Sequence, residues 1–156
     1  MKALKIGVTI VVVFAALLTW LAPIGPLPGF FIGGTHTEVP GEWGDTRQIH
    51  EIQLEVGQGG LPRVVIIWVV QANGNLHIVG ANNSGWVSRL GAGGPVRMKM
   101  EDKTYSLTAS KVTTQWEPIL EAYVNKYRLD YPEIIEGFPT VEEAAGTTSV
   151  FRLTKG

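Results

Sequence analysis

The sequence predicts a mainly β protein, a small antiparallel barrel with one or two helices, preceded by an N-terminal transmembrane helix. Three observations predict this class. The chain opens with a long uncharged apolar run. Its middle alternates apolar and polar residues with a period of two, which is typical of strands with one face in water. Glycine-rich turns separate these segments, and one amphipathic helical pattern follows late in the chain.

Composition limits the classes of function. The chain has 156 residues, a length that favours one compact domain. Its formal net charge of −1 argues against a nucleic-acid partner, because such proteins present a strongly basic face. It has no cysteine, which excludes disulfides, iron–sulfur clusters and thiolate chemistry. The three histidines, His36, His50 and His77, lack the spacing of metal-ligand pairs, so no metal site is predicted.

The N-terminal segment has the character of a membrane anchor. Residues 6–22 carry no charge, follow Lys2 and Lys5, and end at Pro23. A spanning helix needs about 20 apolar residues, with a lower limit of about 17. Because both lysines precede the run, the positive-inside rule places the N-terminus in the cytoplasm. We therefore expect a single-pass protein that contacts membrane lipid through residues 6–22, with its C-terminal domain periplasmic or extracellular.

A cleaved signal peptide is the alternative for this segment. Cleavage after Ala22 would put Trp20 at a position that favours a small residue. We favour the uncleaved anchor and expect three parts: an anchor over residues 1–28, a linker over 29–46 and a folded domain over 47–156. The stretch from Pro23 to Glu42, which includes most of the linker, contains four prolines and five glycines and has no helical or strand period, so it should lie extended against the domain.

The folded domain contains six predicted strands. The run from Arg63 to Val70 is β-branched and apolar on both faces, so it needs cover from a helix or from a second subunit. Asn73-Gly74 predicts a type I′ hairpin, in which both turn residues have positive φ. The predicted strands are residues 52–56, 63–70, 75–79, 96–100, 103–113 and 149–154.

Helices are predicted at three places. Ser84 is placed to cap a short helix over residues 85–90, which the glycines from Gly91 onward should end. Apolar and aromatic residues recur at helical spacing between Trp116 and Leu129, and Thr114 to Glu117 has the form of a capping box. A second short helix is predicted over residues 141–145.

The order of these segments resembles that of a known superfamily. The resembling features are a strand ending in Ile67-Trp68-Val69, the Asn-Gly hairpin, the return strand Leu76-His77-Ile78-Val79, a Gly/Asn/Ser loop, Trp86 with Arg89-Leu90, and Gly94-Pro95-Val96-Arg97-Met98. Over residues 47–154 the chain is similar to the flavin-binding split β-barrel superfamily, which includes pyridoxamine-phosphate-oxidase-like proteins and deazaflavin-dependent nitroreductases.

The resemblance implies a fold, a cofactor and an assembly. The fold is a six-stranded antiparallel split β-barrel, usually a homodimer with FMN or a deazaflavin in a groove between the subunits. The implied activity is that of an oxidoreductase, nitroreductase-like, on a small oxidised substrate. No catalytic residue stands out. The positions that match the cofactor-binding segments are Arg63, Ala81, Asn82, Asn83, Ser84, Trp86 and Arg89.

Two of these residue types suit a flavin phosphate or ring. Arg63 and Arg89 are able to pair with a phosphate in bidentate fashion. Trp86 has no evident core role in the sequence, and its aromatic face suits a flat ring. The alternative hypothesis is a non-catalytic cell-envelope binding or assembly module that keeps the barrel and has lost the cofactor. It rests on the asparagines at 82 and 83, where many flavin-binding members carry a cation.

Overall fold

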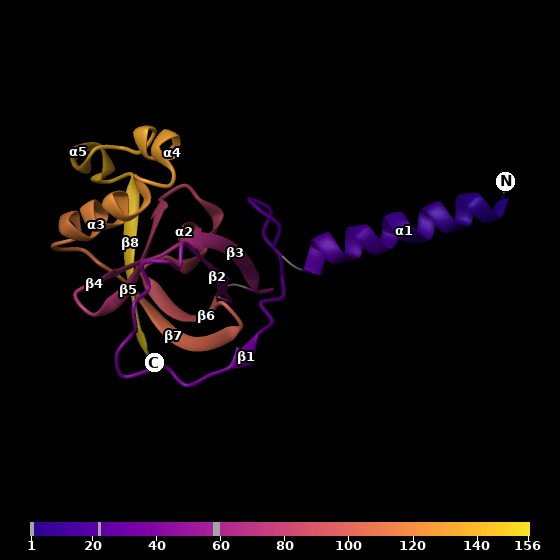
Figure 1. Cartoon of the computed structure of the whole chain (residues 1–156), viewed down its shortest axis with the longest axis horizontal. Coiled ribbons are helices and arrows are strands. Elements are labelled where there is room, and N and C mark those ends of the chain that lie inside the picture. The colour runs from indigo at the N-terminus through magenta and orange to yellow at the C-terminus, as the bar shows by residue number, and fades with distance from the viewer. Residues whose placement is uncertain (1, 22, 58–59) are drawn as a thin grey trace.

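The computed structural model describes residues 2–21, 23–57 and 60–156, and within the first helix the side chains of residues 7–16. Helix α1 (Lys2–Leu21) projects away from the rest of the chain (Figure 1). Its described apolar side chains, such as Val11 and Phe14, are exposed. Within the described part of the chain, no helix is both long and apolar enough to cross a membrane. The transmembrane role of this segment stays a prediction.

The rest of the chain forms a β-barrel with helices (Figure 1). The helices after α1 are α2 (Gly85–Leu90), α3 (Glu117–Tyr127), α4 (Pro132–Glu136) and α5 (Val141–Ala144). Helices α3, α4 and α5 are gathered on one side of the barrel, and α2 lies apart from them (Figure 1). The strands are β1 (Thr35–His36), β2 (Glu51–Val56), β3 (Arg63–Trp68), β4 (Val70–Ala72), β5 (Asn75–Ala81), β6 (Gly93–Met100), β7 (Lys103–Lys111) and β8 (Thr148–Lys155).

The strands form a single sheet in the order β3-β2-β6-β7-β8-β5-β4, in which all neighbours are antiparallel, and β1 pairs in parallel with β7. Only Val69 separates β3 from β4 along the chain, so the two ends of the sheet belong to one bent segment. The barrel class predicted from the sequence is confirmed. The predicted count of six strands is wrong: among the described residues the sheet has eight strands, because the 63–70 strand divides in two and the linker adds β1.

The division at Val69 has a specific cause in helix α3. The Val69 N–H donates to the Tyr127 hydroxyl at 2.9 Å. The Val69 carbonyl oxygen lies 2.7 Å from that hydroxyl and accepts from Lys126 Nζ at 2.8 Å. Because side chains of α3 use both backbone groups of Val69, this residue cannot continue the strand ladder, and the strand breaks there.

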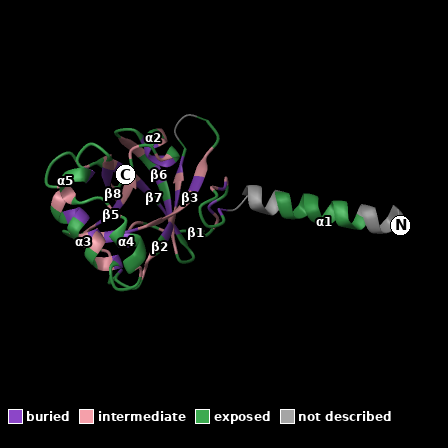
Figure 2. Ribbon diagram, turned by 90° about the horizontal axis from the view of Figure 1, so that it is seen from above, coloured by how far each residue is buried: buried purple, intermediate pink, exposed green. Residues whose placement is uncertain are grey.

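Two clusters of buried side chains support the barrel. Figure 2 shows buried segments along the strands, whereas the described part of α1 is exposed. The interior is mainly aliphatic, and Leu54, Leu76 and Ile78 are fully buried there. The outer side of β4, β5 and β8 packs against α3 through an aromatic cluster that includes Tyr123 and Tyr127. Helix α3 therefore supplies cover for the end of the apolar strand segment.

The Asn73-Gly74 turn and the position of the linker agree with the predictions from the sequence. Asn73 and Gly74 both have positive φ, 51° and 74°, as the predicted hairpin turn requires. The linker lies against the barrel, as predicted: Gly29 pairs with Val64 in an isolated bridge, and Thr104 Oγ1 donates to the Gly33 carbonyl at 2.6 Å.

Helix caps and one strand start differ from the predictions. Ser84 precedes α2 without a side-chain cap, and no capping box forms at Thr114, because α3 begins after Trp116. The capping box instead joins Thr140 to Glu143 at α5. Strand β6 begins at Gly93, which the sequence assigned to the helix end; a Cβ there would collide with the Ala109 carbonyl oxygen, so only glycine allows this pairing.

Candidate functional site

A cavity of about 510 Å³ lies at the C-terminal end of β5 and contains three of the predicted cofactor-binding residues. Its volume falls in the range of about 300–1,000 Å³ that is usual for small-molecule sites. We call it the β5–α3 cavity. Its lining residues are Val79, Gly80, Ala81, Asn82, Asn83, Leu120, Tyr123, Phe138, Pro139, Thr147 and Thr148.

Two aromatic side chains form one wall of this cavity. The rings of Tyr123, from α3, and Phe138, from the segment after α4, stack with centroids 6.1 Å apart and an interplanar angle of 21°. Burial raises the pKa of the Tyr123 hydroxyl, so this side chain stays neutral at physiological pH. The wall is therefore apolar and uncharged, which suits a flat ring.

Asn82 holds the loop that borders the cavity. Its amide nitrogen donates to the Gly146 carbonyl at 2.7 Å, and its amide oxygen accepts from Ser149 Oγ at 2.5 Å. Its backbone N–H donates to the Thr147 carbonyl at 2.8 Å. These contacts fasten the loop to the start of β8, so Asn82 positions the cavity wall, and Asn83 beside it is exposed at the cavity.

Ser84 and Trp86 lie outside the lining of this cavity. The Trp86 side chain is buried in the barrel interior, with its ring 5.9 Å from that of Phe151. It lies so close to Gly80 that a Cβ at that position would collide with the indole. Trp86 therefore has the core role that the sequence did not reveal. Ser84 Oγ is buried and has no hydrogen-bond partner among the described residues.

The two predicted phosphate-binding arginines, Arg63 and Arg89, both lie close to Leu61 and do not line the β5–α3 cavity. Arg89 Nη1 donates to the Leu61 carbonyl at 2.8 Å, two residues before Arg63 opens β3. The structure thus brings Ala81, Asn82 and Asn83 together at the cavity, and places Arg63, Ser84, Trp86 and Arg89 outside its lining. Sequence reasoning missed Tyr123 and Phe138 as site residues, although Tyr123 belonged to the predicted helix.

Comparison with known proteins identifies the fold. No protein-family model matches the sequence, and no curated protein matches it. Several solved structures do. HutZ, the heme storage protein from Vibrio cholerae, is 20% identical with a TM-score of 0.53, over 70% of this chain and 84% of that one.

Two further structures are similar. The FAD and heme binding protein from Mycobacterium smegmatis is 17% identical with a TM-score of 0.51, over 70% of this chain and 62% of that one. A Bacteroides thetaiotaomicron protein named for 5-nitroimidazole antibiotic resistance is 13% identical with a TM-score of 0.52, over 69% and 73%. The chain therefore has the split β-barrel fold. At these identities the likeness establishes the fold.

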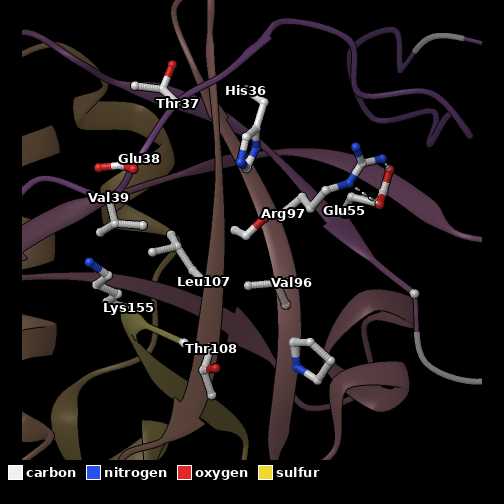
Figure 3. A pocket seen from close by; sticks show the side chains of 14 residues that line it. His36, Thr37, Glu38, Val39, Glu55, Val96, Arg97, Leu107, Thr108 and Lys155 are labelled. Atoms are coloured by element: carbon white, nitrogen blue, oxygen red, sulfur yellow. Dashed lines mark hydrogen bonds and ion pairs between the residues drawn. The ribbon is translucent and has the colours of Figure 1, made fainter.

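A larger groove of about 740 Å³ lies elsewhere on this split-barrel protein, between the linker and strands β6, β7 and β8 (Figure 3). It contains none of the predicted site residues. Its charged side chains are partly paired: Arg97 donates to both carboxylate oxygens of Glu55, at 2.7 and 2.5 Å. His36 lies exposed beside this pair and Lys155 on the opposite side of the groove.

A third cavity, of about 710 Å³, surrounds Lys126. Its ammonium donates to the carbonyl oxygens of Thr46, Ile49 and Val69 at 3.0, 2.7 and 2.8 Å. Burial lowers the pKa of Lys126 to about 8, a shift that the Asp45 carboxylate opposes. The three carbonyl acceptors also favour the charged form. The ammonium group thus bonds both the segment at Thr46 and Ile49 and the strand break at Val69. This lysine has a structural role, and we call it the lysine clamp.

Proposed function

We propose that this split-barrel protein binds the ring of FMN or of a deazaflavin in the β5–α3 cavity, and acts as a nitroreductase-like oxidoreductase on a small oxidised substrate. One observation carries the proposal: an aromatic-walled cavity of suitable volume is bordered by the Ala81–Asn83 loop, which the resemblance assigns to the cofactor. Two of the similar structures, named for FAD and heme binding and for nitroimidazole resistance, support it.

The residues of the cavity fit the ring better than the phosphate. Val79, Leu120, Tyr123 and Phe138 offer apolar surface, and polar groups at Asn83, Thr147 and Thr148 are able to bond ring heteroatoms. No charged residue stands among the described residues that line the cavity. The proposed holders of the phosphate are therefore Arg63 and Arg89, near the start of β3. A bound flavin supplies the redox chemistry, while the protein orients it and excludes water.

The proposal includes a membrane-anchored homodimer. Two lysines followed by an apolar run support an anchor through residues 6–22, and the large apolar side chains described in α1, such as Val11 and Phe14, are exposed. We expect the full chain to stay in the membrane fraction after alkaline carbonate washing and a variant lacking residues 1–28 to be released. Release of the full chain by carbonate would contradict the anchor.

Ligand titration tests the cofactor. The full-length protein, purified in detergent, is titrated with riboflavin, FMN and a deazaflavin, and the ligand fluorescence is followed. We expect saturable micromolar binding of at least one of them. Ala81→Trp fills the cavity and should weaken binding at least tenfold. The matched variant Ala92→Trp, at an exposed turn, should change it less than twofold. Equal binding by both variants would place the ligand elsewhere.

The phosphate contact has its own test. If Arg63 and Arg89 hold the phosphate, FMN binds about tenfold more tightly than riboflavin, in line with about 1.5–3 kcal/mol for charge-assisted hydrogen bonds. The double variant Arg63→Ala/Arg89→Ala should remove this difference and leave riboflavin affinity unchanged. A difference that survives in the double variant would exclude these arginines.

The alternative function is a non-catalytic cell-envelope binding or assembly module on the same scaffold. The uncharged lining of the cavity is the observation that favours it, because many flavin sites place a cation beside the phosphate. A folded protein that binds none of the three ligands would support this alternative over the oxidoreductase.

A further inference from the structure

A further cavity lies on the outer side of the barrel, at the N-terminal end of β5. It has a volume of about 310 Å³ and is almost entirely polar in its side chains. The β4–β5 turn, strands β5, β7 and β8, and the loop that leads into α3 all contribute to it. We call it the His77 pocket. It shares no residue with the β5–α3 cavity.

Three side chains form a row across neighbouring strands at this pocket. His77 on β5 is the pairing partner of Arg152 on β8, and Arg152 is also the partner of Ser110 on β7. Directly opposed residues of antiparallel strands point to the same face, with Cβ atoms about 4.5–5.5 Å apart. An imidazole, a guanidinium and a hydroxyl are therefore aligned on one surface.

One ring nitrogen of His77 has no hydrogen-bond partner among the described residues. The side chain is only 2% exposed, and its Nδ1 atom is buried without a partner among the described residues. Buried polar atoms nearly always have a partner, so an orphan of this kind calls for an explanation. Burial lowers the pKa of His77. A hydrogen bond with the backbone of Asn75 opposes this shift and the nearby charge of Arg152 adds to it, so the imidazole is neutral beside a cation.

The charge of the pocket is one-sided. Arg152 and Lys111 both line it, and no acidic residue stands among the described lining residues. Both side chains are exposed, and neither forms an ion pair within the described part of the chain. The carboxylate of Glu117, in the first turn of α3, does not line the pocket. Two unpaired cations beside hydroxyl and amide donors suit a dianion.

We propose that the His77 pocket binds a phosphate group, free or carried by a small organic molecule. Arg152 and Lys111 supply the charge, Ser110 donates a hydrogen bond, and a phosphate oxygen is the missing partner of His77. The volume of the pocket lies at the lower end of the range for small-molecule sites, so it admits a small organic part beside the phosphate. This site is independent of the proposed flavin cavity.

Phosphate titration of the full-length protein tests the proposal. Inorganic phosphate and glycerol phosphate are added separately at constant pH and ionic strength, with glycerol as the neutral control. The imidazole signals of His77 are followed by NMR and assigned with His77→Gln. We expect a saturable shift with at least one phosphate and none with glycerol. Tighter binding of glycerol phosphate assigns an organic phosphate, and tighter binding of inorganic phosphate assigns the free ion.

Charge-matched variants complete the test. Arg152→Gln should weaken phosphate binding at least tenfold, and Lys111→Gln three- to fivefold. Lys103→Gln, on the same strand as Lys111 but outside the pocket, should change it less than twofold. Both arginine and lysine side chains are exposed, so these variants should fold. The proposal is overturned if no saturable shift occurs, or if Arg152→Gln binds phosphate as tightly as Lys103→Gln.

Discussion

The interior of the barrel and the layer beneath helix α3 are stabilised in different ways. The interior is filled by side chains such as Leu54, Leu76 and Met98, which contribute burial without direction. The layer beneath α3 is aromatic, and the rings of Trp68 and Tyr127 stack there at 4.2 Å. Tyr127 and Lys126 also bond the backbone at the strand break.

The two regions therefore contribute differently: the interior contributes most of the stability, and the layer beneath α3 fixes the position of a backbone segment. Apolar burial of the interior scales with area and tolerates rearrangement. The hydrogen bonds from Tyr127 and Lys126 hold one backbone segment at a defined place, and thereby set where the strand bends. We therefore expect substitutions in the barrel interior to lower the free energy of unfolding the most. Substitutions of Tyr127 and Lys126 should lower it less and should change the backbone conformation at the strand break more.

The largest effect should come from the interior. Leu54→Ala removes a fully buried side chain and should lower the free energy of unfolding by about 3 kcal/mol, since a cavity remains after truncation. Equilibrium denaturation followed by tryptophan fluorescence measures it. Leu129→Ala, at a residue that is 90% exposed, is the matched control and should change stability by less than about 0.5 kcal/mol. Similar losses in both variants would contradict the assignment of the core.

The second-largest effect should come from the Tyr127 hydroxyl. Tyr127→Phe leaves the buried Val69 N–H without an acceptor, and should cost about 2 kcal/mol of unfolding free energy. Tyr131→Phe is the control, because its hydroxyl makes no hydrogen bond among the described residues, and its stability should be unchanged. Amide hydrogen exchange at Val69 gives a direct reading: protection should fall in Tyr127→Phe alone. Retained protection would show that this hydroxyl does not hold the break.

The lysine clamp should have a smaller effect. Lys126→Met keeps the aliphatic stem and removes three hydrogen bonds to carbonyl groups, and we expect a loss of about 1 kcal/mol because the site is only half-buried and water reaches the cavity. Arg128→Met, exposed just after α3, is the control. Denaturation measures both, and equal stability of Lys126→Met and the wild type would show that water replaces the clamp without loss.

The last expected effect is on the pH dependence of stability. Burial lowers the pKa of His77 in the folded protein below the value of 6.5 that it has when exposed, so the unfolded chain binds more protons once the pH falls below about 6.5. Stability is therefore complete above that pH and declines below it, by at most about 1.4 kcal/mol per pH unit. The His77→Gln variant should lack the part of this decline that His77 contributes. The variant His36→Gln, at an exposed histidine, should show the same decline as the wild type. Identical slopes in the wild type and His77→Gln would refute the assignment.

Local patterns predicted most of the barrel, and contacts distant in sequence decided the rest. The period of two and the Asn73-Gly74 turn are local, so the strands and the hairpin appear where they were predicted. The break at Val69 depends on Tyr127, which lies 58 positions away. No local signal at Val69 distinguishes it from its β-branched neighbours, and the strand was therefore predicted as continuous.

The candidate site shows the same division. The resemblance pointed to the loop at Ala81–Asn83, and the structure places this loop at a cavity. The aromatic wall arises because α3 and the segment at Phe138 meet in space, which the sequence does not encode locally. Trp86 is the reverse case: its burial against Gly80 depends on how α2 returns to the barrel, and only the fold reveals that contact.

The position of β8 has a consequence for how the chain acquires its fold. This strand is the final element in the sequence, yet it lies between β7 and β5 in the sheet. While the ribosome is still adding residues 148–155, β5 and β7 both present open edges that are able to pair with other chains. The nascent polypeptide is thus vulnerable to aggregation until β8 has been added, and a premature stop codon between Lys111 and Thr148 would yield a product that keeps both open edges permanently.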